Sequence, residues 1–323
     1  MKTINRRVCI APMLDCTDRH ERYFLRLLSR HVLLYSEMIT TSAIINGDRD
    51  YLLGFSDTEH PVAVQLGGSD PLALARSARI CTEYGYDEIN LNVGCPSDRV
   101  QSGAFGACLM VQPELVAECV SSMKSATTLP VTVKHRTGID DQDSWDELVR
   151  FVQIQIEAGV DALIIHARKA WLKGLSPKQN REIPPLQYDW VYKLKQLFPN
   201  TEIIINGGIK TIDECQQHLV QVDGVMLGRE PYANPYMLAT VDKDLFSDDS
   251  FPVLDRVQLL HQFFPYIESQ MSQGMPFSKI IRHIIGLFHG QPNGRLWRRY
   301  LSENAFKPGA GIEVLEQGSA LVV

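Results

Sequence analysis

The chain has no apolar run long enough to cross a membrane and no low-complexity tract, which excludes membrane-spanning and fibrous classes. Its seven cysteines form no CxxC pair and are odd in number, which argues against a zinc site and a disulfide framework. Residues 1–7 lead into the first apolar run without the apolar core or cleavage site of a signal peptide. We therefore expect a cytoplasmic protein with reduced thiols, no bound metal, no membrane association and no obligate protein partner.

Short apolar, β-branched runs recur along the first three quarters of the chain, separated by segments of helix length. This alternation predicts a parallel sheet with helical crossovers, and eight such units favour a closed (β/α)₈ TIM barrel over an open doubly wound sheet. The eight runs begin at Val8, Leu33, Val62, Glu88, Val131, Ala162, Glu202 and Gly224.

The strand rhythm stops after Arg229, and the remaining sequence has helical periodicity. An acidic segment with Pro252 separates the two parts and is typical of a linker. The fold class is therefore α/β, with a TIM barrel over residues 1–242 and a linker and helical domain over residues 243–323.

Polar residues and glycines follow the expected strands. In a barrel these positions share one face, which carries the active site in enzymes of this fold. Glycines and a guanidinium after the last two strands are suited to bind a phosphate. The residues at this face include Pro12, Met13, Gln65, Asn92, Lys134, His166, Asn206, Gly207, Gly208, Gly228 and Arg229.

Cys95 lies between Gly94 and Pro96 at the end of the fourth expected strand. Glycine permits unusual backbone angles and proline keeps the preceding residue out of the helical region, so the thiol is presented at a rigid strand end. Alone, such a cysteine more often packs as a small apolar group. Together with seven other polar strand ends, it is a candidate catalytic acid.

Charge is distributed unevenly along the chain, whose formal net charge is −6. Between Lys279 and Lys307 there are six Lys or Arg residues and one acidic residue, Glu303. Such asymmetry indicates a surface for a polyanion, with nucleic acid as the natural partner. Arginines also recur in the first expected helix, where acidic residues dilute them, and we interpret that stripe as an ordinary outer surface; it comprises Arg19, Arg22, Arg26 and Arg30.

The chain resembles the tRNA-dihydrouridine synthases, most closely their A subfamily, over nearly its whole length. The most specific match is the block from Asn90 to Pro96. Further matching blocks are Ala11-Pro12-Met13, Gln65-Leu66-Gly67-Gly68, Gly106-Ala107-Cys108-Leu109-Met110, Arg136-Thr137-Gly138, His166-Ala167-Arg168, Asn206-Gly207-Gly208, Gly228-Arg229 and Trp297-Arg298-Arg299-Tyr300.

This resemblance implies an FMN-dependent enzyme that uses NADPH to reduce D-loop uridines of tRNA, at positions 20 and 20a, to 5,6-dihydrouridine. Hydride would pass from reduced FMN to uracil C6, and Cys95 would donate the proton to C5. The implied FMN contacts are Pro12, Met13, Leu14, Gln65, Lys134, His166, Asn206, Gly207, Gly208, Gly228 and Arg229. The implied tRNA contacts are Asn92, Lys178, Arg181, Arg295, Arg298 and Arg299.

The residues alone leave two other functional hypotheses open. Lys134 could form a Schiff base with a phosphorylated sugar in a barrel aldolase or isomerase, with the phosphate at Gly208 and Gly228. That reading leaves Cys95 and the basic helical segment without a role. A catalytically inactive barrel that only binds RNA is the other reading, and it predicts the loss of polar strand ends, which the sequence retains.

Overall fold

The computed structural model describes residues 4–322. The expected domains, 1–242 and 243–323, extend at both ends beyond this range, and residues 1–3 and 323 lie outside it. One eight-stranded parallel sheet forms the centre, with the order β1-β8-β7-β6-β5-β4-β3-β2. Its strands are β1 (Val8–Ile10), β2 (Leu34–Thr40), β3 (Val62–Gly67), β4 (Glu88–Val93), β5 (Val131–Arg136), β6 (Ala162–His166), β7 (Glu202–Asn206) and β8 (Gly224–Leu227).

A parallel bridge between Cys9 and Leu33 joins the first strand to the second and closes the sheet into a barrel. The TIM barrel predicted from the eight runs is thus confirmed, and the second strand begins one residue later than expected, at Leu34. The strands are buried almost throughout because helices cover their outer face and side chains fill the interior. The inside cluster includes Tyr35, Ile164 and Met226.

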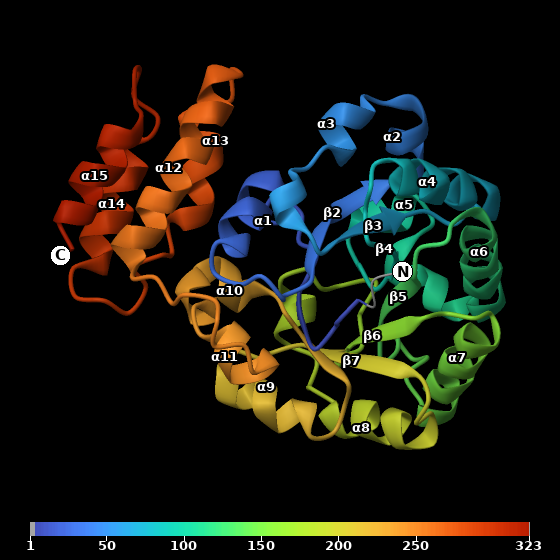
Figure 1. Cartoon of the computed structure of the whole chain (residues 1–323). Coiled ribbons are helices and arrows are strands. Elements are labelled where there is room, and N and C mark those ends of the chain that lie inside the picture. Colours follow the sequence, from blue (N-terminus) through green and yellow to red (C-terminus); the bar gives the residue numbers. More distant parts are fainter. Residues whose placement is uncertain (1–3, 323) are drawn as a thin grey trace.

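Helices surround the barrel in chain order (Figure 1). Many begin at a side chain that caps free backbone N–H groups; Asp70, for example, accepts from Leu72 N and Ala73 N at the start of α4. The helices of this part are α1 (Arg19–Arg26), α2 (Thr41–Asn46), α3 (Arg49–Leu53), α4 (Pro71–Glu83), α5 (Asp98–Ser102), α6 (Pro113–Ala126), α7 (Trp145–Glu157), α8 (Tyr188–Leu197), α9 (Ile212–Leu219), α10 (Arg229–Ala233) and α11 (Val241–Phe246).

A separate helical group, coloured orange to red in Figure 1, lies beside the barrel next to α1 and α10. Trp297 is fully buried in it, against Phe288 and close to Gly318. Its helices are α12 (Arg256–Ser272), α13 (Phe277–Ile281), α14 (Gly294–Asn304) and α15 (Ile312–Ala320). Short 3₁₀ helices lie at Asp57–Glu59, Gly106–Val111, Gln179–Arg181, Pro235–Leu238 and Arg282–Ile284.

The boundary expected at residue 242 falls inside α11. Arg7 Nε donates to the carbonyl of Leu245 at 2.5 Å, so this helix packs on the barrel. The carboxylate of Asp242 accepts hydrogen bonds from Ser29 Oγ and the backbone N–H of Arg30. The helices of the separate group begin at Arg256.

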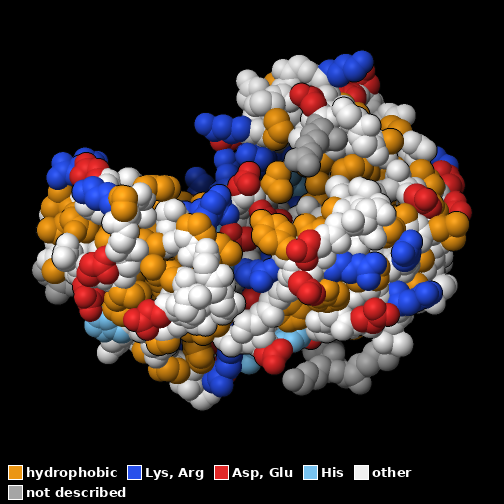
Figure 2. Space-filling view, turned by 90° about the horizontal axis from the view of Figure 1, so that it is seen from above, with side chains coloured by type: hydrophobic (Ala, Val, Ile, Leu, Met, Phe, Trp, Pro, Cys, Tyr) orange, Lys and Arg blue, Asp and Glu red, His pale blue; other side chains and the backbone are white. Residues whose placement is uncertain are grey.

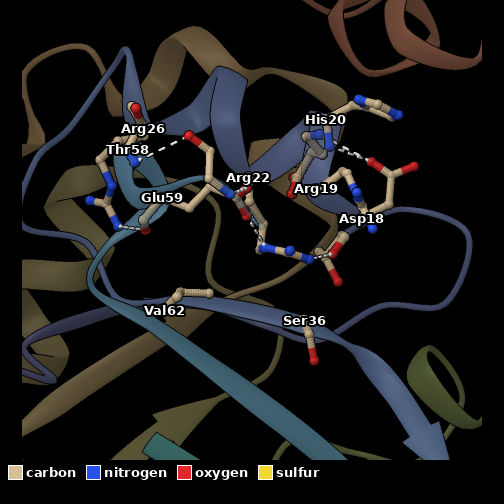
Figure 3. A network of polar contacts seen from close by, with 12 residues as sticks. Asp18, Arg19, His20, Arg22, Arg26, Ser36, Thr58, Glu59 and Val62 are labelled. Carbon is tan, nitrogen blue, oxygen red and sulfur yellow. Dashed lines mark hydrogen bonds and ion pairs between the residues drawn. The ribbon is translucent and has the colours of Figure 1, made fainter. Parts of the chain in front are cut away.

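The interpretation of the α1 arginines as an ordinary outer surface is wrong for Arg22 and Arg26, which are both buried. Arg22 Nε lies 2.7 Å from Glu59 Oε2 (Figure 3). Arg26 donates to backbone carbonyls that include those of Val32 and Glu59. Glu59 is distant in sequence from both arginines, so the helix pattern alone did not reveal these contacts. Burial removes a guanidinium from water, and each of these contacts replaces a hydrogen bond that the group would otherwise make to water.

Candidate active site at the carboxyl ends of the strands

The Cys95 turn is held in place from two sides. The side-chain oxygen of Asn92 accepts hydrogen bonds from Gly94 N at 3.1 Å and Cys95 N at 3.0 Å. On the other side, Arg136 Nε donates to the carbonyl of Gly94 at 2.8 Å. The thiol is partly exposed and lies 3.4 Å from Ser97 Oγ. The turn therefore presents the sulfur to the space above the barrel in a fixed place, as the sequence predicted.

A chain of amides connects this turn to the barrel interior. Gln65 Nε2 donates to Asn90 Oδ1, and Asn92 Nδ2 donates to Gln65 Oε1, both at 2.7 Å. Asn90 and Asn92 therefore point to the same side of β4, as strand alternation requires. With its carbonyl oxygen and one N–H engaged, Asn92 keeps one N–H for another partner.

Lys134 is a cation without a partner of opposite charge. Its Nζ lies 3.0 Å from Asn206 Oδ1, and no carboxylate among residues 4–322 pairs with it. Burial, with a smaller contribution from Arg136, lowers the pKa of Lys134 to about 7. Such a lysine is suited to receive a negative charge, because an anion beside it would restore its ordinary protonation.

His135, the next residue on β5, points away from the interior and packs against Phe151 of α7. Its Nδ1 lies 2.7 Å from the carbonyl of Arg136, and burial lowers its pKa to about 4. A neutral imidazole outside the barrel has no access to the space above the strands. His135 is therefore a packing residue.

Positive charge gathers around His166. Burial lowers the pKa of His166 well below its usual range, and the neighbouring Arg136 and Lys134 lower it further. His166 is thus neutral at physiological pH, and one ring nitrogen can accept a hydrogen bond. Within the described range, Arg136 and Arg168 also lack carboxylate partners, since Arg136 donates to carbonyls and Arg168 to Pro184 O.

Glycines and one guanidinium border the cleft beyond β7 and β8. Gly207 and Gly208 have φ values of 122° and 77°, which L side chains rarely adopt. A Cβ at Gly207 would also lie 2.6 Å from the His166 ring, so only glycine fits there. Arg229, two residues after the end of β8, pairs with Glu182 at 2.8 Å. The two glycines and Arg229 therefore lie together where the Gly-Gly and Gly-Arg pairs predict a phosphate site.

One cleft of about 1530 Å³ joins these groups and extends to the helical group. Figure 2 shows a hollow between the two lobes, with Lys and Arg side chains gathered at its rim. Ten Lys and Arg residues line it against five Asp and Glu residues, in a chain whose net charge is −6. A cleft with such an excess of cations favours a polyanionic ligand.

The cleft brings together most of the predicted site residues. It is lined by Pro12, Met13, Leu14, Gln65, Asn92, Cys95, Lys134, His166, Arg181, Asn206, Gly207, Gly208, Gly228 and Arg229. The other four predicted tRNA contacts are exposed but do not line it: Lys178 lies on the loop after β6, and Arg295, Arg298 and Arg299 lie on α14.

Seven of the ten cations of the cleft were not among the predicted site residues: Arg19, Arg22, Arg136, Arg168, Lys210, Lys279 and Arg282. Arg136 was identifiable, because it lies two residues after Lys134 on the same strand and therefore on the same side. Lys279 and Arg282 line the cleft from the helical group and belong to the basic segment already noted. Their spacing gave no sign that they, rather than the arginines of α14, face the barrel.

Comparison with known proteins agrees with this geometry. The family model described as dihydrouridine synthase (Dus) matches residues 9–321. The chain belongs to the dihydrouridine synthase family. The match extends over the barrel and the helical group, so both parts belong to this enzyme family.

Among dihydrouridine synthases, the chain is 57% identical over 317 residues to the tRNA-dihydrouridine(20/20a) synthase of Yersinia pestis, covering 98% of this chain and 91% of that protein. It is 58% identical to the protein of the same name from Escherichia coli O6:H1, covering 98% and 95%. The protein of that name from Synechocystis sp. is 57% identical over 307 residues, covering 95% and 92%.

A solved structure, a 2-naphthoyl-CoA reductase complex, superposes with a TM-score of 0.56 at 10% identity. It covers 73% of this chain, and this chain spans half the length of that one. At this identity the likeness concerns the fold alone. No helix within residues 4–322 is both long and apolar enough to span a membrane.

Proposed function

We propose that this dihydrouridine synthase reduces uridines 20 and 20a in the D-loop of tRNA to 5,6-dihydrouridine, using FMN and NADPH in the cytoplasm. The observation that carries the proposal is that one cation-rich cleft contains both the partly exposed thiol of Cys95 and Lys134, which has no carboxylate partner in the described chain. The names of relatives at 56–58% identity support tRNA as the substrate and the two positions.

The residues present fit an FMN molecule. Lys134 would sit beside the part of the flavin that becomes negative on reduction, since it has no carboxylate of its own in the described chain. The positive-φ glycines after β7 and the guanidinium of Arg229 would hold the phosphate. The remaining contacts would come from Pro12, Met13, Leu14, Gln65, His166, Asn206 and Gly228, all of which line the cleft.

When bound and reduced by NADPH, FMN supplies a hydride to C6 of the uracil. The protein must then bring a proton to C5, and Cys95 is the group placed to do so. Its thiol points into the cleft from a turn fixed by Asn92 and Arg136, so the sulfur need not move to find the base. The free N–H of Asn92 is available to the uracil edge.

The RNA must place an unstacked base deep in the cleft, because the sulfur lies at the strand ends rather than on the outer surface. Arg181 at the rim and the cleft wall of the helical group would contact the phosphates next to that base. Lys178, Arg295, Arg298 and Arg299 would contact more distant phosphates, since they are exposed outside the cleft.

Two measurements test this function directly. The purified protein should carry a yellow cofactor that is identified as FMN after denaturation. With NADPH, it should form dihydrouridine in an unmodified tRNA transcript at positions 20 and 20a. Protein that neither binds FMN nor forms dihydrouridine when FMN is added would refute the proposal.

The Schiff-base alternative draws support from the same lysine, because a pKa near 7 also suits a nucleophilic amine. It gives no role to the fixed Cys95 turn or to the cations of the helical group. Borohydride with a phosphorylated aldose or ketose should leave Lys134 unmodified. A covalent adduct on Lys134 would favour the aldolase reading.

A further inference from the structure

Asp18, the residue before α1, joins the barrel to the helical group. Its Oδ1 caps α1 by accepting from His20 N at 2.9 Å and Glu21 N at 3.2 Å. Its Oδ2 lies 2.7 Å from Arg282 Nη2 and 3.0 Å from His283 Nε2. One carboxylate thus holds the start of a barrel helix and two side chains of the other domain.

Aromatic side chains make further contacts at this joint. His20 Nδ1 lies 2.8 Å from the hydroxyl of Tyr266 on α12, and Tyr23 stacks on the same ring at a centroid distance of 3.8 Å. Phe24 packs against Phe263 at 5.1 Å. Figure 3 shows Asp18 and His20 together at one end of α1, with the Arg22 and Glu59 pair farther along. The packed rings stabilise the contact between the two parts, whereas the ion pair of Asp18 constrains their relative orientation.

The residues of this joint also form part of the cleft wall. Asp18 and Arg282 both line the cleft, and Lys279 lies one helical turn before Arg282. Of the Arg282 donors, Nη2 is engaged by Asp18, while Nη1 has no hydrogen bond to any residue in the 4–322 range. Lys279 and Arg282 therefore both line the cleft, and Asp18 of the barrel sets the position of Arg282.

We propose that Asp18 is a positioning residue for the RNA: by pairing with Arg282 and His283 it fixes the cationic cleft wall relative to Cys95, and so selects which base reaches the sulfur. This inference rests on the proposed function. Cys95 is fixed to the barrel, whereas the wall that contacts the RNA backbone belongs to the other domain. A change in the angle between them would bring a neighbouring nucleotide into register with the sulfur.

Asp18→Asn separates this role from helix capping. Asparagine caps a helix about as well as aspartate, so α1 keeps its first turn, while the charge that binds Arg282 and His283 is lost. Asp70→Asn is the matched control, because Asp70 caps α4 in the same way and has no partner in the helical group. Lys279→Ala removes a cleft cation that does not pair with Asp18.

The experiment measures dihydrouridine at positions 20 and 20a separately, in one tRNA transcript with uridine at both, together with kcat and KM. For Asp18→Asn we expect a changed ratio of the two products and a fall in kcat/KM for tRNA of about tenfold or more. Reduction of the bound flavin by NADPH without tRNA should match wild type. Lys279→Ala should raise KM and keep the ratio, and Asp70→Asn should behave as wild type.

Three outcomes would overturn the proposal: an unchanged ratio in Asp18→Asn, an equal change in Asp70→Asn, or an equal loss of flavin reduction. Failure of the proposed function is distinguished from these at once. In that case wild-type protein itself forms no dihydrouridine, and no comparison of variants is needed to see it.

Discussion

At the amino-terminal end of the barrel, Arg6 lies 2.6 Å from Glu88 and 2.7 Å from Glu202, and all its charge is compensated. At the carboxyl end, Lys134 and Arg136 meet no carboxylate within residues 4–322. Both ends remove charge from water, but only the first supplies a counter-charge. On the proposed function, the negatively charged ligand would supply the missing counter-charge at the second end.

The two ends also differ in what surrounds the charge. Glu88 is fully buried and additionally accepts hydrogen bonds from Tyr35 and Thr132, both at 2.6 Å. The cations at the other end open on the cleft. On the proposed function, the amino-terminal end serves stability and the carboxyl end serves binding, as is usual for barrels of this fold.

The largest expected effect concerns the compensated end. Glu88→Ala leaves Arg6 with only the half-exposed Glu202 and removes the acceptor of two buried hydroxyls. Breaking a buried pair in this way should lower the free energy of unfolding by about 3–5 kcal/mol. Urea denaturation measures this loss. A change below about 1 kcal/mol would show that the two ends do not differ as described.

The second prediction concerns exposed cations that lie outside the cleft. Replacing Arg295, Arg298 and Arg299 by Ala should weaken tRNA binding and flatten its salt dependence by nearly one unit of slope per lost phosphate contact. Stability should change little, because the three side chains are exposed.

A matched control for that triple variant is the replacement of Arg76 and Arg79, which are exposed on α4 away from the cleft. Those changes should leave the slope unaltered. If the triple variant shows the wild-type affinity and slope across a salt series, the α14 arginines are only a solvated face. The RNA contacts would then lie at Arg181, Lys279 and Arg282.

The smallest effect is a pH dependence at the uncompensated end. Burial lowers the pKa of Lys134 to about 7, whereas a lysine in the unfolded chain has a pKa of about 10.4. Between these values the unfolded chain binds more protons, so this residue makes stability rise with pH across that window. Below pH 7 the penalty of the charged amine is fully present.

Lys134→Met removes that contribution. Without added flavin, the variant should gain stability relative to wild type at pH 6, and its advantage should shrink as the pH rises toward 9. Denaturation midpoints at a series of pH values measure the difference. A constant difference across the series would contradict the assigned cause.

Much of the barrel was predictable from sequence, because apolar runs and the glycines that end them are local signals. The starts of β1 and β3 to β8 match the runs, and β2 begins one residue late since Leu33 makes the bridge to Cys9 instead. Lys134 and His135 point to opposite sides of β5, as strand alternation requires. The sequence did not predict which charged side chains pair with residues that are distant in the sequence.

The two arginine-rich helices show this limit. Arg22 and Arg26 of α1 are buried against Glu59 and nearby carbonyls, while Arg298 of α14 is exposed, although the helices have similar spacing of charge. Burial depends on contacts between segments, which periodicity does not encode. For the same reason the sequence indicated a basic segment but did not indicate that Lys279 and Arg282 face the cleft.

The most direct test of the central claim compares wild type with Cys95→Ala in a single turnover. Each protein is loaded with FMN, reduced with NADPH and mixed with unmodified tRNA, and dihydrouridine is counted over time. We predict that Cys95→Ala is reduced by NADPH at the wild-type rate but forms dihydrouridine about 10²- to 10⁴-fold more slowly, because it lacks the acid. Formation at a near-normal rate would contradict the assignment and leave Cys95 as a packing residue.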